Sequence, residues 1–392
     1  MAPSPFCIEI DESVLDDLRV RLDRTRWVSD LGDQGWTYGA SIPYMRQLVA
    51  YWRDGFDWRA QERALNAFAN FRTTLKDDTG IHFIHERGRG PEPLPIVLTH
   101  GFPDSIARFT KIIPMLTDPA SHGADPSDSF DVVAPSLPGY LFSDRPHSDG
   151  SVLHVGDLWH ELMTQLGYDR YVAHGGDWGS TITELLARDH SRHVLAIHLT
   201  DVPFFHAFQK PDDPSRAERK YFDSVEEYQQ REGAYAFVQG AQPQVAAVGL
   251  NDSPAGLATW IVEKFRRWSD CDGDVERRFT KDELLTNVML YWATGTINSS
   301  FLPYYDVAQA GAMTWIGQKI KEWRGTTTVP AAFAMFPKDL TSPPREWAER
   351  FFNVQRWTEM KSGGHFAALE EPESLVRDIR EFFRSFRNGT NR

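Results

Sequence analysis

Short apolar runs alternate with helical stretches along the middle of this 392-residue chain, and that alternation limits the folds open to it. The runs that we predict as buried strands are residues 96–99, 130–134, 171–173 and 194–199. Helices are predicted between them, at 155–166 and from about 178 to 189. Because strands that alternate with helices form a parallel sheet covered on both faces, the predicted fold class is α/β.

The alternation stops near residue 201 and resumes at 329, which predicts a helical insertion in the α/β core. Strands are expected at 71–75, 81–85, 329–335 and 354–358, and an amphipathic helix runs through Leu375, Ile379 and Phe382. The first 70 residues are helical in pattern and rich in aromatic side chains, so they should pack onto the rest. We therefore expect an N-terminal extension at 1–70, core at 71–200 and 326–392, and a cap at 201–325.

Charge and cysteine content exclude several classes of protein. Forty-two Lys and Arg residues against 55 Asp and Glu residues leave a formal charge of −13, which repels nucleic acid. Cys7 and Cys271 form no CxxC pair, which argues against a disulfide framework and a zinc site. With neither an apolar signal segment at the N-terminus nor a long apolar run, we expect no membrane anchor and a cytoplasmic protein.

The stretch VAHGGDWGS at residues 172–180 is the most informative for chemistry. A buried strand enters a turn of small residues and a helix follows, which is the geometry of a nucleophile elbow, with Asp177 in the central position. An isolated Gly-Gly-Asp is more often a helix N-cap than a nucleophile. The motifs described below favour the nucleophile here. A carboxylate that attacks a saturated carbon forms an ester, which water can hydrolyse. The residue type therefore predicts alkyl transfer followed by hydrolysis.

HGFP at residues 100–103 directly follows the strand 96–99. In α/β hydrolases the loop after this strand supplies one backbone N–H of the oxyanion hole, and the residue after the nucleophile supplies the other. The predicted donors are the amides of Phe102 and Trp178.

His365 lies in the late loop SGGHF at residues 362–366, where the hydrolase order of nucleophile, acid and histidine predicts the base. The acid should follow the strand at 329–335. Asp339 stands there in FPKDL, and Glu346 is a weaker competitor in an apparent helix.

With these sites in chain order, the sequence resembles the epoxide hydrolases of the α/β-hydrolase fold. Within them it resembles the microsomal-type branch, which carries an N-terminal epoxide-hydrolase extension. The resemblance covers nearly the whole chain and depends on four further stretches: RLDRTRW at 21–27, NDSPAGL at 251–257, LLTNV at 284–288 and GGHFAALEEP at 363–372. It implies an enzyme that opens an epoxide to a vicinal diol, with no metal or organic cofactor.

The resemblance also implies two cap tyrosines that donate hydrogen bonds to the epoxide oxygen. Tyr235, in GAYAFVQ, matches the first position, and Tyr304, in SSFLPYY, matches the second. The adjacent Tyr305 competes with Tyr304 and is expected at least to contact substrate, as Trp178 is. Aromatic residues in the cap are consistent with an apolar or aromatic epoxide as the partner, and they are equally consistent with a structural core between the cap and the N-terminal extension. A homodimer is left open.

Two other functions remain open on the sequence alone. A haloalkane dehalogenase shares the Asp nucleophile and the histidine, and Trp178 could help to bind halide. The cap tyrosines and the extension favour the epoxide reaction instead. A ligand receptor that lost its chemistry would keep the pocket, although every catalytic position is filled here.

Overall fold

The computed structural model describes residues 2–29, 31–32, 35–145, 152–309 and 326–389. They form a nine-stranded sheet with strand order β1-β2-β3-β5-β4-β6-β7-β8-β9. The strands are β1 (Ser4–Pro5), β2 (Asn70–Thr74), β3 (Gly80–Glu86), β4 (Leu94–Thr99), β5 (Phe130–Pro135), β6 (Tyr171–Gly175), β7 (Val194–Leu199), β8 (Thr327–Met335) and β9 (Phe352–Glu359). The first three pairings are antiparallel, and those from β5 to β9 are parallel.

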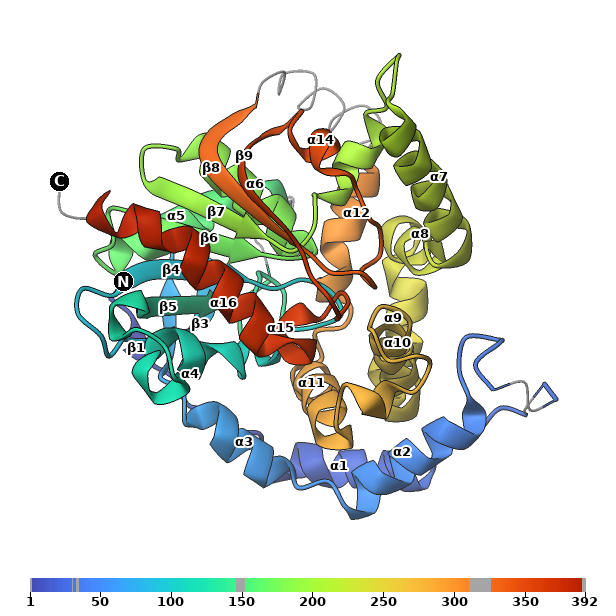
Figure 1. Cartoon of the computed structure of the whole chain (residues 1–392). Coiled ribbons are helices and arrows are strands. Elements are labelled where there is room, and N and C mark those ends of the chain that lie inside the picture. The colour runs from blue at the N-terminus through green and yellow to red at the C-terminus, as the bar shows by residue number, and fades with distance from the viewer. Residues whose placement is uncertain (1, 30, 33–34, 146–151, 310–325, 390–392) are drawn as a thin grey trace.

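Helices cover both faces of this sheet (Figure 1). Helices α4 (Ile112–Thr117) and α16 (Pro372–Phe383) contact each other over one face, and α5 (Val155–Gln165) packs with α6 (Trp178–Asp189) over the other. The central strands β4, β5, β6 and β7 are buried along their whole length, as expected for parallel strands with two covered faces. The predicted α/β fold class is confirmed.

Six helices lie between β7 and β8 in the described residues and form a layer beyond the carboxyl ends of the parallel strands (Figure 1). They are α7 (Arg216–Arg231), α8 (Ala234–Ala241), α9 (Pro243–Asp252), α10 (Pro254–Arg267), α11 (Lys281–Thr294) and α12 (Leu302–Gln309). Reciprocal side-chain caps start two of them, Ser215 with Glu218 on α7 and Thr280 with Glu283 on α11. The end of the predicted cap, residues 310–325, lies outside the described residues.

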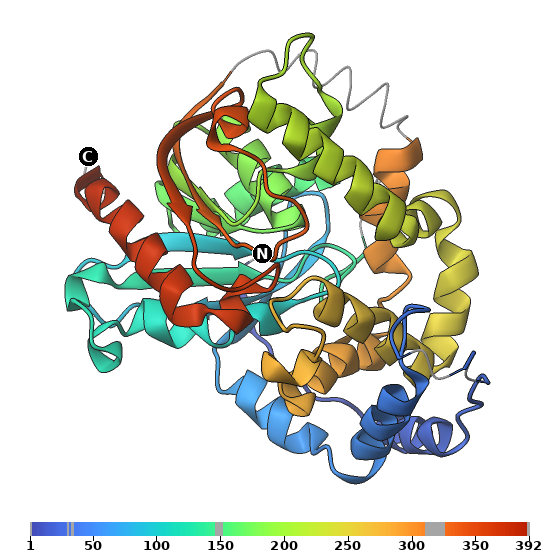
Figure 2. The ribbon, with the colours of Figure 1, turned by 45° about the vertical axis from the view of Figure 1, so that its right-hand side comes forward.

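The N-terminal helices α1 (Glu12–Asp23), α2 (Ile42–Asp54) and α3 (Trp58–Asn66) run along the outside of this layer (Figure 2). They contact α10 and α11. Arg21 donates to the Asp252 carboxylate at 2.6 Å, and the Tyr51 hydroxyl donates to Asp282 at 2.7 Å. The aromatic-rich N-terminal segment therefore packs onto the helical insertion.

The predicted strands are all present, and their ends shift by at most a few residues. Strand β1 was not predicted, because two residues cannot show an alternating pattern. In the described ranges, no helix combines the length and apolar character that crossing a membrane requires.

Candidate active site

Asp177 lies at the tip of the turn between β6 and α6. Its backbone has φ 59° and ψ −129°, a conformation that costs free energy for a residue with a side chain. The turn is possible because its neighbours are small: a Cβ on Gly176 would collide with Thr200 and Arg108. A Cβ on Gly101 would overlap the Asp177 carboxylate itself. The glycines thus clear the space into which this carboxylate projects.

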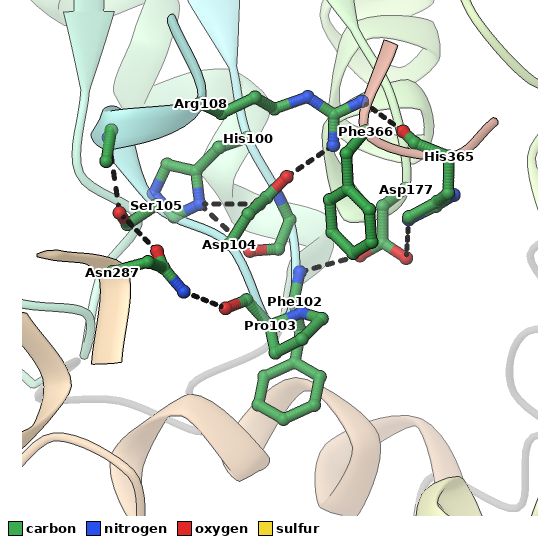
Figure 3. Close-up of polar contacts among 12 residues, drawn as sticks. His100, Phe102, Pro103, Asp104, Ser105, Arg108, Asp177, Asn287, His365 and Phe366 are labelled. Carbon is green, nitrogen blue, oxygen red and sulfur yellow. Dashed lines mark hydrogen bonds and ion pairs between the residues drawn. The ribbon is translucent and has the colours of Figure 1, made fainter. Parts of the chain in front are cut away.

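The Asp177 carboxylate contacts two groups that were predicted from the sequence to lie beside it. Its Oδ1 accepts a hydrogen bond of 2.8 Å from the Phe102 backbone N–H, and its Oδ2 lies 3.4 Å from Nε2 of His365 (Figure 3). Trp178 is the first residue of α6, so its amide is one of the N–H groups that a helix leaves without an intrahelical partner. Of the two predicted oxyanion-hole residues, Phe102 thus contacts the Asp177 carboxylate through its amide, and Trp178 follows Asp177 directly in the chain.

His365 bridges two carboxylates. Its Nδ1 lies 2.8 Å from Oδ1 of Asp339, which follows β8, and its backbone N–H donates to the Trp268 carbonyl at 2.8 Å. Burial alone would lower the pKa of His365, but the carboxylates of Asp339 and Asp177 raise it to about 10. Glu346, the competing acid, lies on α14 (Arg345–Ala348) and bonds to Ser215 instead.

The two cap tyrosines face this carboxylate from the insertion. Tyr235 on α8 and Tyr304 on α12 have ring centroids 5.8 Å apart, and Tyr304 packs edge-on against Trp178 at 5.0 Å. Helices α8 and α12 approach closely because Gly240 lies against the Tyr304 backbone. Burial raises the pKa of both phenols above the ordinary value, as does the charge of Asp177. Both hydroxyls therefore carry their proton at neutral pH.

The structure separates the two adjacent tyrosines on α12. Tyr304 lines the cavity above Asp177, whereas Tyr305 is 36% exposed and is not among the lining residues. Consecutive helical residues point about 100° apart, and on α12 it is Tyr304 that points into the cavity while Tyr305 points away from it. The predicted contact of Tyr305 with substrate therefore has no support from the cavity lining, whereas that of Tyr304 has.

A buried ion pair behind Asp177 was not predicted from the sequence. The Asp104 carboxylate pairs with the Arg108 guanidinium and also accepts the Gly101 N–H at 2.9 Å (Figure 3). Arg108 in turn donates to the His365 carbonyl at 2.8 Å. Burial would raise the pKa of Asp104, but Arg108 lowers it below the usual range. One ion pair therefore ties the loop of Phe102 to the loop of His365.

The insertion is also bonded to the loop that carries Phe102. Asn287 on α11 donates to the Pro103 carbonyl at 2.8 Å and accepts from the Ser105 hydroxyl at 2.8 Å (Figure 3). Tyr291, one turn further along α11, donates to the Asp104 carbonyl at 2.7 Å. The side chains of one helix of the insertion thus help to fix the loop that carries Phe102.

A cavity of about 370 Å³ opens above Asp177. Apart from the tyrosines, the ionisable residues that line it within the described part of the chain are Asp177, Asp201, Asp339 and His365. The rest of the wall is mainly aromatic or aliphatic: Val152, Leu153, Trp178, Val202, Phe204, Phe205, Phe208, Tyr228, Tyr235, Ala236, Phe237, Tyr304, Val307, Ala308 and Leu340. The arrangement suits an apolar molecule that reacts at one polar end.

Known epoxide hydrolases are similar to this chain over nearly its whole length. A family model of the epoxide hydrolase N terminus matches residues 3–109, and a model of the alpha/beta hydrolase fold matches residues 95–248. Epoxide hydrolase 1 of Sus scrofa is 35% identical over 404 residues, which cover 96% of this chain and 88% of that protein.

Two solved structures are similar over nearly their full length. The juvenile hormone epoxide hydrolase of the silkworm Bombyx mori superposes with a TM-score of 0.88 at 27% identity, covering 100% of this chain and 96% of that one. The Aspergillus niger epoxide hydrolase gives a TM-score of 0.83 at 28% identity, covering 98% and 97%.

Proposed function

Since the chain belongs to the epoxide hydrolases of the α/β-hydrolase fold, in the branch with the epoxide hydrolase N terminus, we propose that Asp177 is its covalent nucleophile. The family hydrolyses epoxides to vicinal diols. The observation that carries the proposal is the contact chain from the Phe102 amide through the Asp177 carboxylate to His365 and Asp339.

Ring opening uses both sides of the cavity. Oδ2 of Asp177 attacks one oxirane carbon, a C–O bond forms, and the bond from that carbon to the ring oxygen breaks. The departing oxygen takes a proton from Tyr235 or Tyr304, whose phenols are protonated at neutral pH. The phenolate recovers its proton from the His365 imidazolium. The enzyme then holds a hydroxyalkyl ester, neutral tyrosines and a neutral imidazole.

The same step prepares His365 to act as a base. In the resting enzyme, the charges of Asp339 and Asp177 raise the pKa of His365 against the effect of burial, so the imidazole is protonated. Ester formation removes the charge of Asp177 and its upward effect on that pKa. Neutral His365, oriented by Asp339, then removes a proton from a water molecule that attacks the ester carbonyl.

The Phe102 and Trp178 amides stabilise the oxyanion that this attack forms on Asp177. Removing one donor of this kind typically costs about 3 kcal/mol of activation free energy. Collapse of the intermediate expels the diol and regenerates the Asp177 carboxylate beside protonated His365. No step requires a group beyond the chain, the epoxide and one water molecule.

We further propose that helices α7 to α12 act as the cap and that the substrate is an apolar or aromatic epoxide. The supporting observation is the aromatic wall of the cavity, to which Phe204, Phe205 and Phe237 contribute. Burying apolar surface there contributes about 25 cal/mol per Å² to binding.

A panel of terminal and aryl-substituted epoxides, with chiral analysis of the diols, tests this function. We expect a higher kcat/KM for aryl epoxides than for epoxides that carry a carboxylate, and no diol from Asp177→Asn. Halide release from chloroalkanes while every epoxide stays unchanged would contradict the proposal.

A further inference from the structure

A third carboxylate lines the cavity beside Asp177, and the mechanism above does not use it. Asp201 follows β7, and its side chain lines the catalytic cavity. Its Oδ1 accepts the backbone N–H of Asp177 at 3.0 Å. Its Oδ2 lies 2.7 Å from the Ser180 hydroxyl oxygen. Asp201 therefore contacts the strained elbow at the residue on which the chemistry occurs.

The Ser180 hydroxyl has one proton for two close oxygen atoms, and this indicates the protonation state of the Asp201 carboxyl group. The Ser180 hydroxyl oxygen also lies 2.7 Å from the backbone carbonyl oxygen of Asp177. A serine hydroxyl has one proton, and it can lie between only one of these two oxygen pairs. Two oxygens at 2.7 Å without a proton between them would repel each other. A proton on Oδ2 of Asp201 supplies the missing donor.

We propose that Asp201 is a neutral carboxylic acid in the resting enzyme and positions the nucleophile by closing a hydrogen-bonded ring around its backbone. In this ring Asp177 N–H donates to Oδ1 of Asp201, and Oδ2–H donates to Ser180. The Ser180 hydroxyl donates to the Asp177 carbonyl, which the Ser180 N–H also contacts at 3.0 Å. Both peptide groups that flank the Asp177 side chain are thereby fixed. This inference rests on the proposed role of Asp177.

The surrounding charges favour the neutral form. The groups that face Asp201 are the carboxylates of Asp177 and Asp339, the imidazole of His365 and the Tyr221 phenol on α7. Burial raises the pKa of Asp201 to about 7, and the charge of Asp339 acts in the same direction, while Ser180 and His365 oppose it. A third negative charge here would also retain the proton on His365, and the imidazole must lose that proton before it activates water.

Asp201→Asn tests the proposal because an amide has the shape of a protonated carboxyl group. Its carbonyl can accept the Asp177 N–H, and its NH₂ can donate to Ser180. We expect diol formation within about threefold of wild type at pH 6. Wild type should lose single-turnover ester hydrolysis as the pH rises through about 7, whereas the amide variant should keep its rate to about pH 8.5.

Asp201→Leu removes the ring, and the exposed Asp223→Asn serves as the matched control for loss of a carboxylate. We expect the leucine variant to lose at least about tenfold in kcat, with KM changed less, because the Asp177 N–H is left unpaired. Thermal unfolding checks that each variant is folded. Asp223→Asn should reproduce the wild-type pH profile.

Two results would overturn the proposal. One is a loss of activity in Asp201→Asn as large as in Asp339→Asn, which would mean that Asp201 acts as a charged group. The other is an unchanged alkaline decline in Asp201→Asn. Failure of the proposed mechanism is a separate result, because wild-type protein would then form no alkyl-enzyme at all.

Discussion

The two halves of the active site are built by different interactions. On the core side, Asp177, His365 and Asp339 follow parallel strands and are joined by contacts of 2.8 and 3.4 Å, with the Asp104–Arg108 ion pair behind them. On the cap side, Tyr235 and Tyr304 come from helices and are positioned by ring packing. The charged groups of the core side are joined by ion pairs and hydrogen bonds, whereas the two phenols are held by ring packing together with contacts among the hydroxyls of Tyr228, Tyr235 and Tyr304.

This difference matches what the proposed mechanism requires of each half. Attack by a carboxylate and transfer of a proton from water require reacting atoms within about 3 to 3.5 Å and aligned, so the core side needs directional contacts. A phenol that donates to a departing oxygen must follow that oxygen as the ring opens. Packing limits the position of the ring while the hydroxyl can still rotate.

The largest losses of stability and of kcat are expected from Arg108→Met on the core side. It leaves the Asp104 charge buried without its ion-pair partner, which typically costs about 3 to 5 kcal/mol of folding free energy. It also frees the His365 carbonyl, so we expect kcat to fall about 100-fold. Chemical denaturation and steady-state kinetics measure the two effects.

The double variant Arg108→Met with Asp104→Asn is the control for the buried charge. Without a charge on residue 104, more than half of the lost stability should return, while kcat should stay low because His365 is still unsupported. Recovery of full activity in the double variant would show that Arg108 does not position His365.

An intermediate loss of kcat is expected from Tyr304→Phe on the cap side. The ring and its contact with Trp178 remain, so stability should change by less than about 1 kcal/mol, while the lost donor lowers kcat by about 10- to 100-fold. Tyr305→Phe is the matched control, because its exposed phenol does not line the cavity. Equal losses in the two variants would refute the placement of Tyr304 as the second donor.

The smallest effect on kcat is expected from Asn287→Ala, which breaks two of the hydrogen bonds between the insertion and the loop that carries Phe102. The variant removes hydrogen bonds to the Pro103 carbonyl and the Ser105 hydroxyl and should cost about 1 to 3 kcal/mol of stability. Because the core contacts of Asp177 remain, kcat should fall less than tenfold. A loss as large as that of Arg108→Met would mean that the halves are not built separately.

The same contrast explains what could be predicted from the sequence. The elbow at Asp177, the loop of Phe102 and the loop of His365 follow predicted strands in a fixed order, so local patterns located all three. Tyr235 and Tyr304 lie in a helical insertion where most tyrosines only pack. Their assignment needed the resemblance to a family, and the structure was needed to separate Tyr304 from Tyr305.

The supporting residues could not be predicted because their partners are remote in the chain. Arg108 contacts a carbonyl 257 residues away. Asp201 meets Asp177 only because β6 and β7 are neighbours in the sheet. One signal was present: Asp104 and Arg108 are opposite charges four residues apart, directly after HGFP, in a stretch that becomes buried.

The central claim is that Asp177 carries the alkyl group as an ester and is regenerated through its own carbonyl. A single turnover with excess enzyme in water labelled with ¹⁸O tests it directly, by mass spectrometry of the peptide that contains Asp177 and of the diol. The account predicts label in the Asp177 carboxylate and none in the first diol formed. Label in the diol, with Asp177 unlabelled, would show that water opens the epoxide without a covalent step.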